Sequence, residues 1–530
     1  MKLRFFYILI GFLILESCAR RGNPEGGELD VDPPVFESAQ PNHETLHFKS
    51  EKIRIIFNEF IKLNNLNNQL VISPPMKYRP VISPVGSASK IINIKILDTL
   101  KENTTYTFNF GNSVEDNNEG NLLSNFKYIF STGDYIDSLK VIGTVKDGFE
   151  KEVDANISVL LYEITEEFTD SIIYKEQPNY VGSTLDSINF ELTNLKDGKY
   201  LMIALKDLNN NYKFDPKQDK IAFHSEFISL PTEETFELTL FKEILPFKLT
   251  RPSEIKKGHI YFGYEGDAKN IKIELISEKP TNFESRLSFE KGKDTVSYWF
   301  SPQLKDSMQF RVTNNDFEKN ITVKLRSKEI DSLTISSEMG STLSLRDTFS
   351  ITTNIPIERI DKSKISITDK DSLNVLFTTL MDATKRTLKL NFDKTYNNKY
   401  QFKMLPGAIE DLFGNVNDSL KYNVTTKHPD DYGIIRLTLN NPKSHNIILD
   451  LVDEKGELIQ REYTSQSRQF KFEFLAANNY MFRVIYDANN NGKWDSGNFL
   501  QKQVPEKVVH FNEKIELKAN WIENTTINLK

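Results

Sequence analysis

The stretch Lys52-Ile-Arg-Ile-Ile-Phe57 decides the fold class, because apolar and charged residues nearly alternate along it. A period of two is typical of a β-strand that is buried on one face only. The pattern returns in Ile91-Ile-Asn-Ile-Lys-Ile96 and Tyr106-Thr-Phe-Asn-Phe110. The chain also holds 37 Phe and 20 Tyr, residues that favour strands, and no long stretch keeps a helical period. The sequence therefore predicts an all-β protein.

Polar landmarks punctuate these strands. Asn58-Glu59-Phe60 follows the first strand, Asp116-Asn-Asn-Glu-Gly-Asn121 forms a turn, and the segment from Phe126 to Thr132 ends in Phe-x-Thr. Together with Tyr106-Thr-Phe, these motifs resemble the bacterial Ig-like domain of the S-layer type. The resemblance covers about 100 residues and implies an Ig-like β-sandwich over residues 33–133.

A second set of landmarks lies at a near-constant offset of 294 or 295 residues. Asn397-Asn-Lys-Tyr400 parallels Asn103-Thr-Thr-Tyr106, Glu410 to Asn415 parallels Glu115 to Asn121, and Tyr422 to Thr426 parallels Tyr128 to Thr132. A constant offset across three landmarks indicates a duplicated domain. The copy departs from the family pattern at Thr353-Asn354-Ile355. We expect a second Ig-like domain over residues 336–428.

Another repeat follows each Ig-like copy at an offset of 280. The segment from Phe190 to Tyr200 matches that from Phe470 to Tyr480, and Asp207-Leu-Asn-Asn-Asn-Tyr-Lys-Phe-Asp215 matches Asp487-Ala-Asn-Asn-Asn-Gly-Lys-Trp-Asp495. The motif Phe-x-Leu-x-x-Leu-x-x-Gly-x-Tyr ahead of Asp-x-Asn-x-Asn resembles the prealbumin-like sandwich of carboxypeptidase regulatory and adhesin modules. The resemblance implies two such domains, at 136–235 and 430–530, that act as spacers or binding modules.

Five short strand patterns between the two pairs predict a further β-sandwich of no recognised family over residues 240–335. They are 260–264, 271–275, 295–300, 308–312 and 321–325. Tandem Ig-like domains usually form a rod, because their termini lie at opposite ends. We therefore expect a rod whose functional surface lies far from the N-terminus.

The N-terminus carries a basic Lys2 and Arg4, an apolar run from Phe5 to Leu15, and then Leu15-Glu16-Ser17-Cys18. The run is too short for a transmembrane helix, which needs about 20 residues, but it suits a signal peptide at 1–17. Leu three residues before the only cysteine resembles a bacterial lipoprotein signal. The resemblance implies cleavage before Cys18 and lipidation with diacylglycerol and an acyl chain such as palmitate. The alternative is a secretory signal with a chance cysteine.

The residues after Cys18 set further expectations. Residues 18–32 are rich in Gly, Pro and charge, and predict a flexible tether. Cys-Ala-Arg-Arg-Gly-Asn-Pro-Glu-Gly-Gly resembles a Bacteroidota lipoprotein family with one Ig-like domain next to the anchor. This implies an outer-membrane lipoprotein that faces either the periplasm or the cell surface. The net charge of −7 gives no basic excess, so no nucleic-acid partner is expected.

Two polar patterns are candidate sites. Alternating side-chain oxygens in a turn can hold calcium, and the loops offer Asp207, Asn209, Asn211 and Asp215, and again Asp487, Asn489, Asn491 and Asp495. The missing bidentate Glu predicts weak binding, at about 10⁻⁴–10⁻³ M. The alternative is a turn held by side-chain-to-backbone hydrogen bonds. No other cofactor is expected.

The second pattern is Asp, then Ser or Thr, then a small or aliphatic residue. It resembles the O-glycosylation signal of Bacteroidota; the alternative is that Asp-Ser simply starts strands. The implied acceptors are Thr99, Ser138, Ser171, Ser187, Thr295, Ser307, Ser332, Ser372 and Ser419.

Known catalytic motifs are lacking, and the seven His residues are scattered. Trp299, Trp494 and Trp521 could stack on sugars or serve as core and rim residues. We expect a non-enzymatic scaffold or interaction subunit with other envelope proteins as partners, for example in outer-membrane protein assembly or secretion. The alternative is a surface glycan-binding or adhesion lipoprotein.

Overall fold

The computed structural model describes residues 30–302, 304, 306–337 and 339–529, so the signal peptide, Cys18 and most of the tether lie outside the described residues. The all-β prediction is confirmed. Helix in the described part is limited to short turns, which are α2 (Leu66–Gln69), α3 (Ile172–Lys175), η1 (Lys362–Lys364) and η2 (Pro429–Asp431). Five successive hydrophobic clusters define domains 1 to 5, at 36–131, 139–240, 248–324, 335–425 and 433–528.

Domain 1 is a sandwich of two sheets around an Ile- and Phe-rich core. Strand β2 (Lys52–Leu63) has the burial pattern that its alternation predicts, with Ile53, Ile55 and Phe57 buried. One sheet has the order β1-β2-β5-β4 with β7 also on β2, and the other has the order β3-β6-β8. The remaining bounds are β1 (Phe36–Gln40), β3 (Val71–Ser73), β4 (Val81–Ser83), β5 (Ser89–Lys95), β6 (Thr105–Asn109), β7 (Val114–Asp116) and β8 (Lys127–Ser131).

Domain 4 repeats the hydrogen bonds that the Ig-like landmarks make in domain 1. Asn58 Oδ1 accepts from the N–H of Val35 at 2.7 Å, and Asn354 Oδ1 accepts from the N–H of Thr334 at 2.8 Å. Asn354 therefore makes the same side-chain-to-main-chain hydrogen bond as Asn58, although the two residues after it differ from the family pattern. The bounds are β25 (Ile335–Ser336), β26 (Phe349–Thr353), β27 (Ile357–Ile360), β28 (Ile365–Thr368), β29 (Phe377–Met381), β30 (Thr387–Phe392), β31 (Lys399–Met404), β32 (Ile409–Asp411) and β33 (Leu420–Thr425).

Two further landmarks have matching roles in these domains. The hydroxyls of Tyr106 and Tyr400 each accept a main-chain N–H from five residues upstream, at 2.9 and 2.8 Å. Asp116 and Asp411 each accept several N–H groups of the turn that follows. The recurring Tyr and Asp positions thus hold the same corners and turns in both copies.

Domains 2 and 5 share a topology in which the first strand is the centre of a three-stranded sheet. In domain 2, β9 (Leu139–Asp147) pairs antiparallel with β12 (Asn189–Leu195) and parallel with β16 (Thr235–Leu240). In domain 5, β34 (Gly433–Asn440) pairs in the same way with β37 (Arg468–Leu475) and β40 (Ile522–Asn528). The second sheets have the orders β11-β10-β13-β14, with β15 on β13, and β36-β35-β38-β39. Their bounds are β10 (Ser158–Glu163), β11 (Tyr180–Ser183), β13 (Gly198–Lys206), β14 (Lys220–Phe223), β15 (Ile228–Leu230), β35 (Ile447–Asp453), β36 (Leu458–Thr464), β38 (Asn478–Tyr486) and β39 (Val508–Leu517).

The second sheet of domain 2 is buried on both faces. Met202 and Ala204 of β13 face the sandwich core, whereas Leu201, Ile203 and Leu205 belong to a separate outer cluster. That outer cluster also contains Val71 of domain 1 and Phe499 of domain 5. The continuous apolar run along β13 is therefore explained by burial on two sides, as in other doubly covered sheets.

Domain 3 contains the five expected strands and three more. Its sheets have the orders β17-β19-β22-β21, with β18 on β19, and β20-β23-β24. The bounds are β17 (Lys248–Leu249), β18 (Ser253–Lys256), β19 (His259–Glu265), β20 (Lys272–Leu275), β21 (Glu284–Phe289), β22 (Thr295–Ser301), β23 (Ser307–Asn314) and β24 (Phe317–Lys324).

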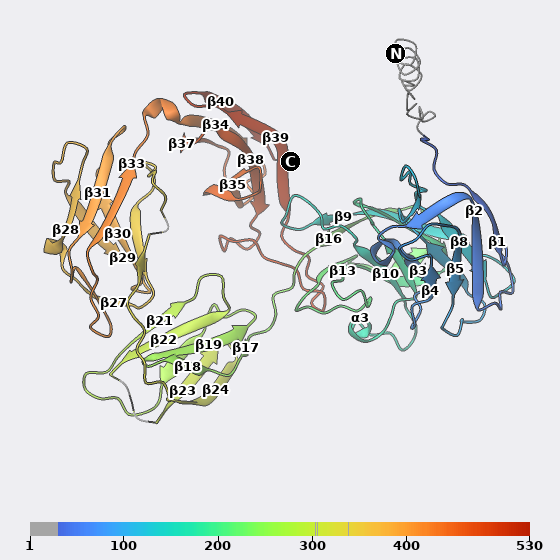
Figure 1. The fold of residues 1–530 in the computed structure, drawn as a ribbon, viewed down its shortest axis with the longest axis horizontal. Coiled ribbons are helices and arrows are strands. Elements are labelled where there is room, and N and C mark those ends of the chain that lie inside the picture. The colour runs from blue at the N-terminus through green and yellow to red at the C-terminus, as the bar shows by residue number, and fades with distance from the viewer. Residues whose placement is uncertain (1–29, 303, 305, 338, 530) are drawn as a thin grey trace, which may run out of the picture.

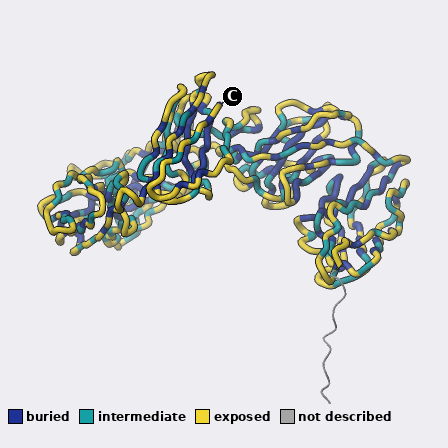
Figure 2. The backbone as a smooth tube through the Cα atoms, turned by 90° about the horizontal axis from the view of Figure 1, so that it is seen from above, coloured by how far each residue is buried: buried dark blue, intermediate teal, exposed yellow. Residues whose placement is uncertain are grey.

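The expectation of a linear rod is wrong. Figure 1 shows that domains 3 and 4 lead away from domain 2 and that domain 5 returns to lie beside it. Domain 5 contacts domain 2 directly, through a 2.5 Å hydrogen bond from Ser496 Oγ to the Lys242 carbonyl and through the burial of Phe499. Figure 2 shows buried segments inside the domains and exposed loops around them. The chain is therefore an arch whose far end closes on its second domain, and the C-terminus lies near the middle of the molecule (Figures 1 and 2).

Candidate functional site

The first Asp/Asn loop connects β13 to β14 and is organised by a buried carboxylate. Asp207 Oδ1 accepts from the N–H of Asn209 at 3.0 Å, and its Oδ2 accepts from the N–H of Tyr212 at 2.6 Å. Burial raises the pKa of the Asp207 carboxyl, and these hydrogen bonds oppose that shift. Both oxygens are thus used within the turn.

The second loop, between β38 and β39, has the same organisation. Asp487 accepts from the N–H groups of Asn491 and Gly492 at 2.9 and 2.8 Å. Asp495 accepts from the side-chain amides of Asn489 and Asn491. Burial acts to raise the pKa of Asp495, but these amides and Lys493 lower it overall.

A third carboxylate, absent from the predicted set, closes each loop. Asp219 accepts from the N–H groups of Leu208 and Asp215 at 3.0 and 2.8 Å. Glu506 accepts from the equivalent N–H groups of Ala488 and Asp495 at 2.7 and 3.1 Å. These residues lie at different distances along the chain from their loops, so no common spacing could have revealed them.

The calcium prediction stays open. Among the described residues, no group of three or more His, Cys, Asp or Glu side chains has an arrangement that could hold a metal ion. The other candidate oxygens are also largely used within the loops: Asn211 Oδ1 accepts from the N–H of Lys213, Asn491 Oδ1 from the N–H of Lys493, and both oxygens of Asp215 accept hydrogen bonds. The main-chain donors on Asp207 and Asp487 favour the alternative, in which each loop is a hydrogen-bonded turn.

The predicted glycosylation acceptors all lie at least partly at the surface. Ser171, Thr295 and Ser307 are half-buried, and the exposed ones are Thr99, Ser138, Ser187, Ser332, Ser372 and Ser419. Several of the preceding Asp residues have structural roles: Asp98 accepts from the N–H of Lys77, and Asp137 accepts from the Thr105 hydroxyl at 2.7 Å. Glycosylation therefore stays a prediction, as does lipidation of Cys18, which lies outside the described residues.

Domains 1 and 2 are joined by polar contacts that range from exposed to buried. Asp186 accepts from the side-chain amides of Gln69 and Asn112 at 3.0 and 3.2 Å. The Ser73 hydroxyl accepts from the N–H of Val181 at 3.1 Å. The Ser73 bond is buried and Val71 packs in the outer cluster of domain 2, so separating the two domains would expose both, and the two domains form a single unit.

Domains 2 and 5 exchange aromatic side chains, and we call this contact the clasp. Phe499 of domain 5 is fully buried against Phe223 of domain 2, with ring centroids 5.5 Å apart, and its N–H donates to Glu243 Oε1 at 2.6 Å. In return, Phe149 of domain 2 lies under the guanidinium of Arg483 at 4.3 Å and against Trp494 at 5.1 Å. The outer face of the second sheet in each domain thus receives an aromatic ring from the other domain.

The clasp also depends on a close backbone approach. A Cβ at Gly497 would lie 2.7 Å from both the Gln503 carbonyl oxygen and the Phe241 ring. Lys502 adds an ion pair with Asp170 at 2.6 Å. The segment 496–502 therefore fits domain 2 closely.

A polar chain crosses from domain 3 to domain 4. His259 is buried and stacks on Trp299 with ring centroids 3.4 Å apart, and its Nε2 lies 3.0 Å from the Ser297 hydroxyl. That hydroxyl donates to Glu290, which also accepts from Arg386 of domain 4 at 2.7 Å. Of the three Trp residues, Trp299 is thus a core residue, Trp494 lies in the clasp, and Trp521 is 52% exposed.

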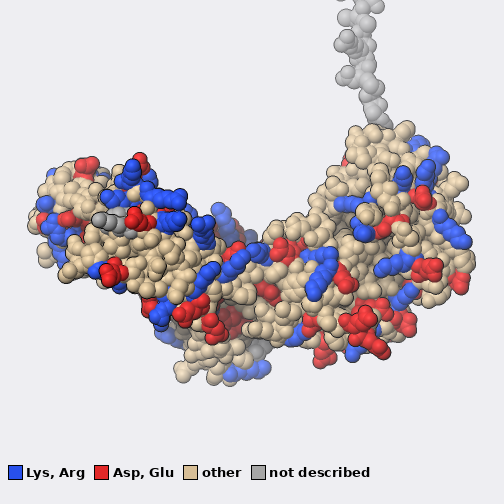
Figure 3. Space-filling view, turned by 90° about the horizontal axis from the view of Figure 1, so that it is seen from below, with Lys and Arg blue, Asp and Glu red and all other residues tan. Residues whose placement is uncertain are grey.

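The surface carries both charge signs. Figure 3 shows Lys and Arg interspersed with Asp and Glu on one face of the molecule. None of the helices in the described residues is long and apolar enough to span a membrane.

Comparison with known proteins supports the Ig-like resemblance of domain 1. The sequence profile of the bacterial Ig-like domain family matches residues 30–132. No curated protein sequence matches the chain.

Several solved structures are similar to the chain at low scores. They are the Bacillus anthracis TIE protein (12% identity, 95% of this chain and 76% of that one, TM-score 0.15), the S-layer protein rSbsC (12%, 91% and 67%, 0.15) and the major pilin subunit BcpA of Bacillus cereus (10%, 74% and 99%, 0.14). At these scores the solved structures carry no argument about activity or partners. Residues 30–132 are similar to the bacterial Ig-like domain family, and the chain as a whole is an all-β protein built of sandwich domains.

Proposed function

We propose that the protein is a non-enzymatic lipoprotein of the outer membrane that acts as a multi-domain scaffold, accompanying an outer-membrane protein assembly or secretion machine. The observation that supports this most is the clasp. Ser496 and Phe499, which directly follow the second Asp/Asn loop, position domain 5 against domain 2. A chain that fixes the mutual arrangement of five sandwiches suits the task of holding partner proteins at set positions.

Extraction in mild detergent tests the scaffold role. A stoichiometric β-barrel partner that co-purifies with the tagged full-length chain is the expected result. A lone monomer that binds glycan would instead support the alternative, a surface glycan-binding or adhesion lipoprotein. Protease treatment of whole cells, with and without permeabilisation of the outer membrane, assigns the face, which the sequence leaves open.

The lipid anchor has a separate test. Cys18→Ser removes the only thiol, so incorporation of a labelled fatty acid should be lost and the chain should leave the membrane fraction. Ser17→Ala is the matched control, because a small residue before the cysteine is retained. Undiminished labelling of Cys18→Ser would contradict lipidation at this residue.

A further inference from the structure

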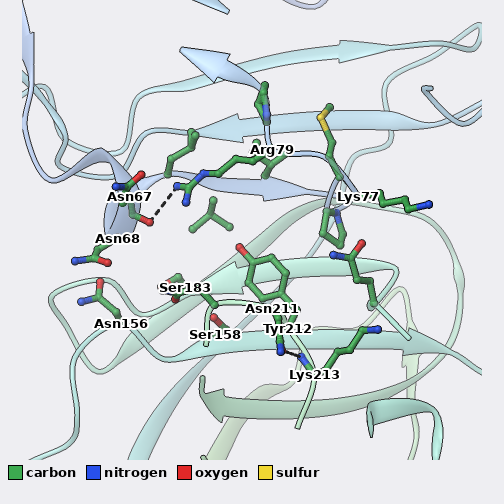
Figure 4. Close-up of a pocket in the computed structure, with 18 residues that line it drawn as sticks. Asn67, Asn68, Lys77, Arg79, Asn156, Ser158, Ser183, Asn211, Tyr212 and Lys213 are labelled. Atoms are coloured by element: carbon green, nitrogen blue, oxygen red, sulfur yellow. Dashed lines mark hydrogen bonds between the residues drawn. The ribbon is translucent and has the colours of Figure 1, made fainter. Parts of the chain in front are cut away.

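A cavity of about 360 Å³ lies between domains 1 and 2. Domain 1 contributes the segment from α2 to the start of β4, and domain 2 contributes the loop that follows β13 and residues near β10 and β11. Figure 4 shows Arg79 and Lys77 on the segment above the cavity and Tyr212 and Lys213 on the loop below it. The volume lies within the range of small-ligand pockets, about 300–1,000 Å³.

The cavity is cationic. Lys77, Arg79 and Lys213 line it, and none of the described lining residues is Asp or Glu. The nearby Asp98 and Asp207 accept main-chain N–H groups, from Lys77 and Tyr212 among others. Three cations without a lining carboxylate attract an anion, and a guanidinium is suited to a planar carboxylate.

The rest of the lining suits a sugar ring. Six side-chain amides supply donors and acceptors together, as sugar hydroxyls do; they are Asn67, Asn68, Asn156, Asn210, Asn211 and Gln177. In the described part of the chain, Asn156 Oδ1 is buried without a hydrogen-bond partner. Leu70, Ile72 and Met76 provide an apolar wall for the C–H face of a ring.

Tyr212 gives an independent indication of a binding role. Its φ is +58°, a left-handed conformation that is unfavourable for a bulky residue by about 1–3 kcal/mol. The duplicated loop has the same conformation at this position, with φ +77°, but uses Gly492. Glycine meets the backbone requirement without strain, whereas Tyr212 accepts the strain and packs part of its ring against the outer cluster of domain 2. Figure 4 shows its ring pointing up toward the segment that carries Arg79.

The equivalent lysines of the two loops, Lys213 and Lys493, have different partners. Lys493 pairs with Asp495 of its own loop at 3.2 Å, whereas Lys213 donates to the neutral carbonyl of Lys175. The charge of Lys213 is therefore available to a ligand, and that of Lys493 is already balanced.

We propose that the cavity between domains 1 and 2 binds a short acidic saccharide, with Arg79, Lys77 and Lys213 holding the carboxylate and Tyr212 packing on the ring. The site is independent of the scaffold role, because it lies in the unit formed by domains 1 and 2 rather than in the clasp.

Calorimetric titration of the mature full-length chain tests the site with three carboxylated probes: a galacturonate disaccharide, a hyaluronan disaccharide and sialyllactose. At least one should bind saturably below about 1 mM and more weakly at high salt. Arg79→Gln and Lys213→Gln should each weaken binding roughly 10- to 100-fold. The matched control Lys493→Gln should leave it unchanged.

Tyr212→Gly separates binding from folding. The variant relieves the backbone strain but loses the packing of the ring on the outer cluster, so the melting temperature should change little while binding falls about tenfold or more. A lower melting temperature with intact binding would overturn the role of Tyr212.

Three further outcomes would overturn the proposal. One is no binding of any of the three probes at about 10 mM. Another is equal binding of lactose, which would remove the acidic requirement. The last is equal binding of inorganic phosphate, which would make the cavity a general anion site.

Discussion

His259 is a single residue whose ionisation couples to the stability of domain 3. Burial, and then the positive charge of Arg386, lower its pKa to about 3, against 6.5 for an unburied imidazole. The folded state therefore binds no proton here between pH 6.5 and 3, whereas the unfolded state does. Stability falls as the pH drops through this window, by about 2 kcal/mol at pH 5 for one full proton.

The measurement is unfolding in urea at pH 7 and pH 5, followed by hydrogen exchange of peptides spanning β19 and β22, because fluorescence would also report on Trp494 and Trp521. In His259→Gln the part of the pH dependence due to this imidazole should vanish, although the variant is less stable overall. His428→Gln is the control, because His428 is exposed and lies outside domain 3, at the N-cap of η2. An unchanged pH dependence in His259→Gln would contradict the assignment.

Individual residues show how far the sequence could predict the candidate sites. The loop residues from Asp207 to Asp215 were found because they recur at a constant offset. Asp219 and Glu506 were missed because they follow their loops by unequal distances. The exchange of Tyr212 for Gly492 is visible in the repeat, but its meaning depends on the cavity that domain 1 completes.

Among the elements, β35 and β38 carry a buried ion pair on the outer face of their sheet. Asp450 is fully buried and accepts from Arg461 at 2.7 Å and from Arg483 at 2.8 Å. Asp450→Ala leaves a buried guanidinium unpaired, which should destabilise domain 5 by about 3–5 kcal/mol. The control is Glu454→Ala, whose exposed pair with Lys514 is screened by solvent and should contribute little to stability. Hydrogen exchange of peptides spanning β35 and β38 measures both, and equal protection in the two variants would contradict the prediction.

The Asp/Asn loops give a test at the same scale. Weak calcium binding at about 10⁻⁴–10⁻³ M would add roughly 1–2 kcal/mol per site in 5 mM calcium. Because main-chain donors already use the oxygens of Asp207 and Asp487, we expect no shift in melting temperature between calcium and chelator. A rise in calcium that is lost in Asp495→Asn would instead establish the predicted site.

Strand patterns were predictable where one face is exposed and ambiguous where both are covered. The alternation from Lys52 to Phe57 predicted β2 and its buried face. The unbroken apolar run from Tyr200 to Leu205 has no alternation, so it could not show which face is in the core or that the second face is covered by Val71 and Phe499 of other domains.

At the scale of the whole molecule, the clasp decides the shape. Phe499→Ala removes a fully buried ring, at a cost of about 3–5 kcal/mol, which is enough to open a contact between two domains. The radius of gyration from small-angle scattering should increase. Leu500→Ala is the matched control. Leu500 is next to Phe499 in the chain, but its side chain is 58% exposed, so this change should leave the radius of gyration unchanged. An equally compact Phe499→Ala chain would mean that the clasp does not hold the arch.

The course of the chain was the least predictable feature. Phe499 lies in the loop segment Gly497-Asn-Phe-Leu-Gln501, which has no periodicity. Its partners Phe223 and Glu243 are more than 250 residues away, and only the folded arrangement brings them together.

The closed arch has a mechanical consequence. A pulling force applied between residue 30 and residue 529 runs through domains 1, 2 and 5 and across the clasp, so domains 3 and 4 carry no tension while the clasp holds. When Phe499 leaves its site, the two folded domains enter the line of force and the molecule lengthens before any sandwich unravels. Force spectroscopy would record this lengthening as an early step, and Phe499→Ala should abolish that step. The closed arch would thus let the molecule extend under load without the unfolding of a domain.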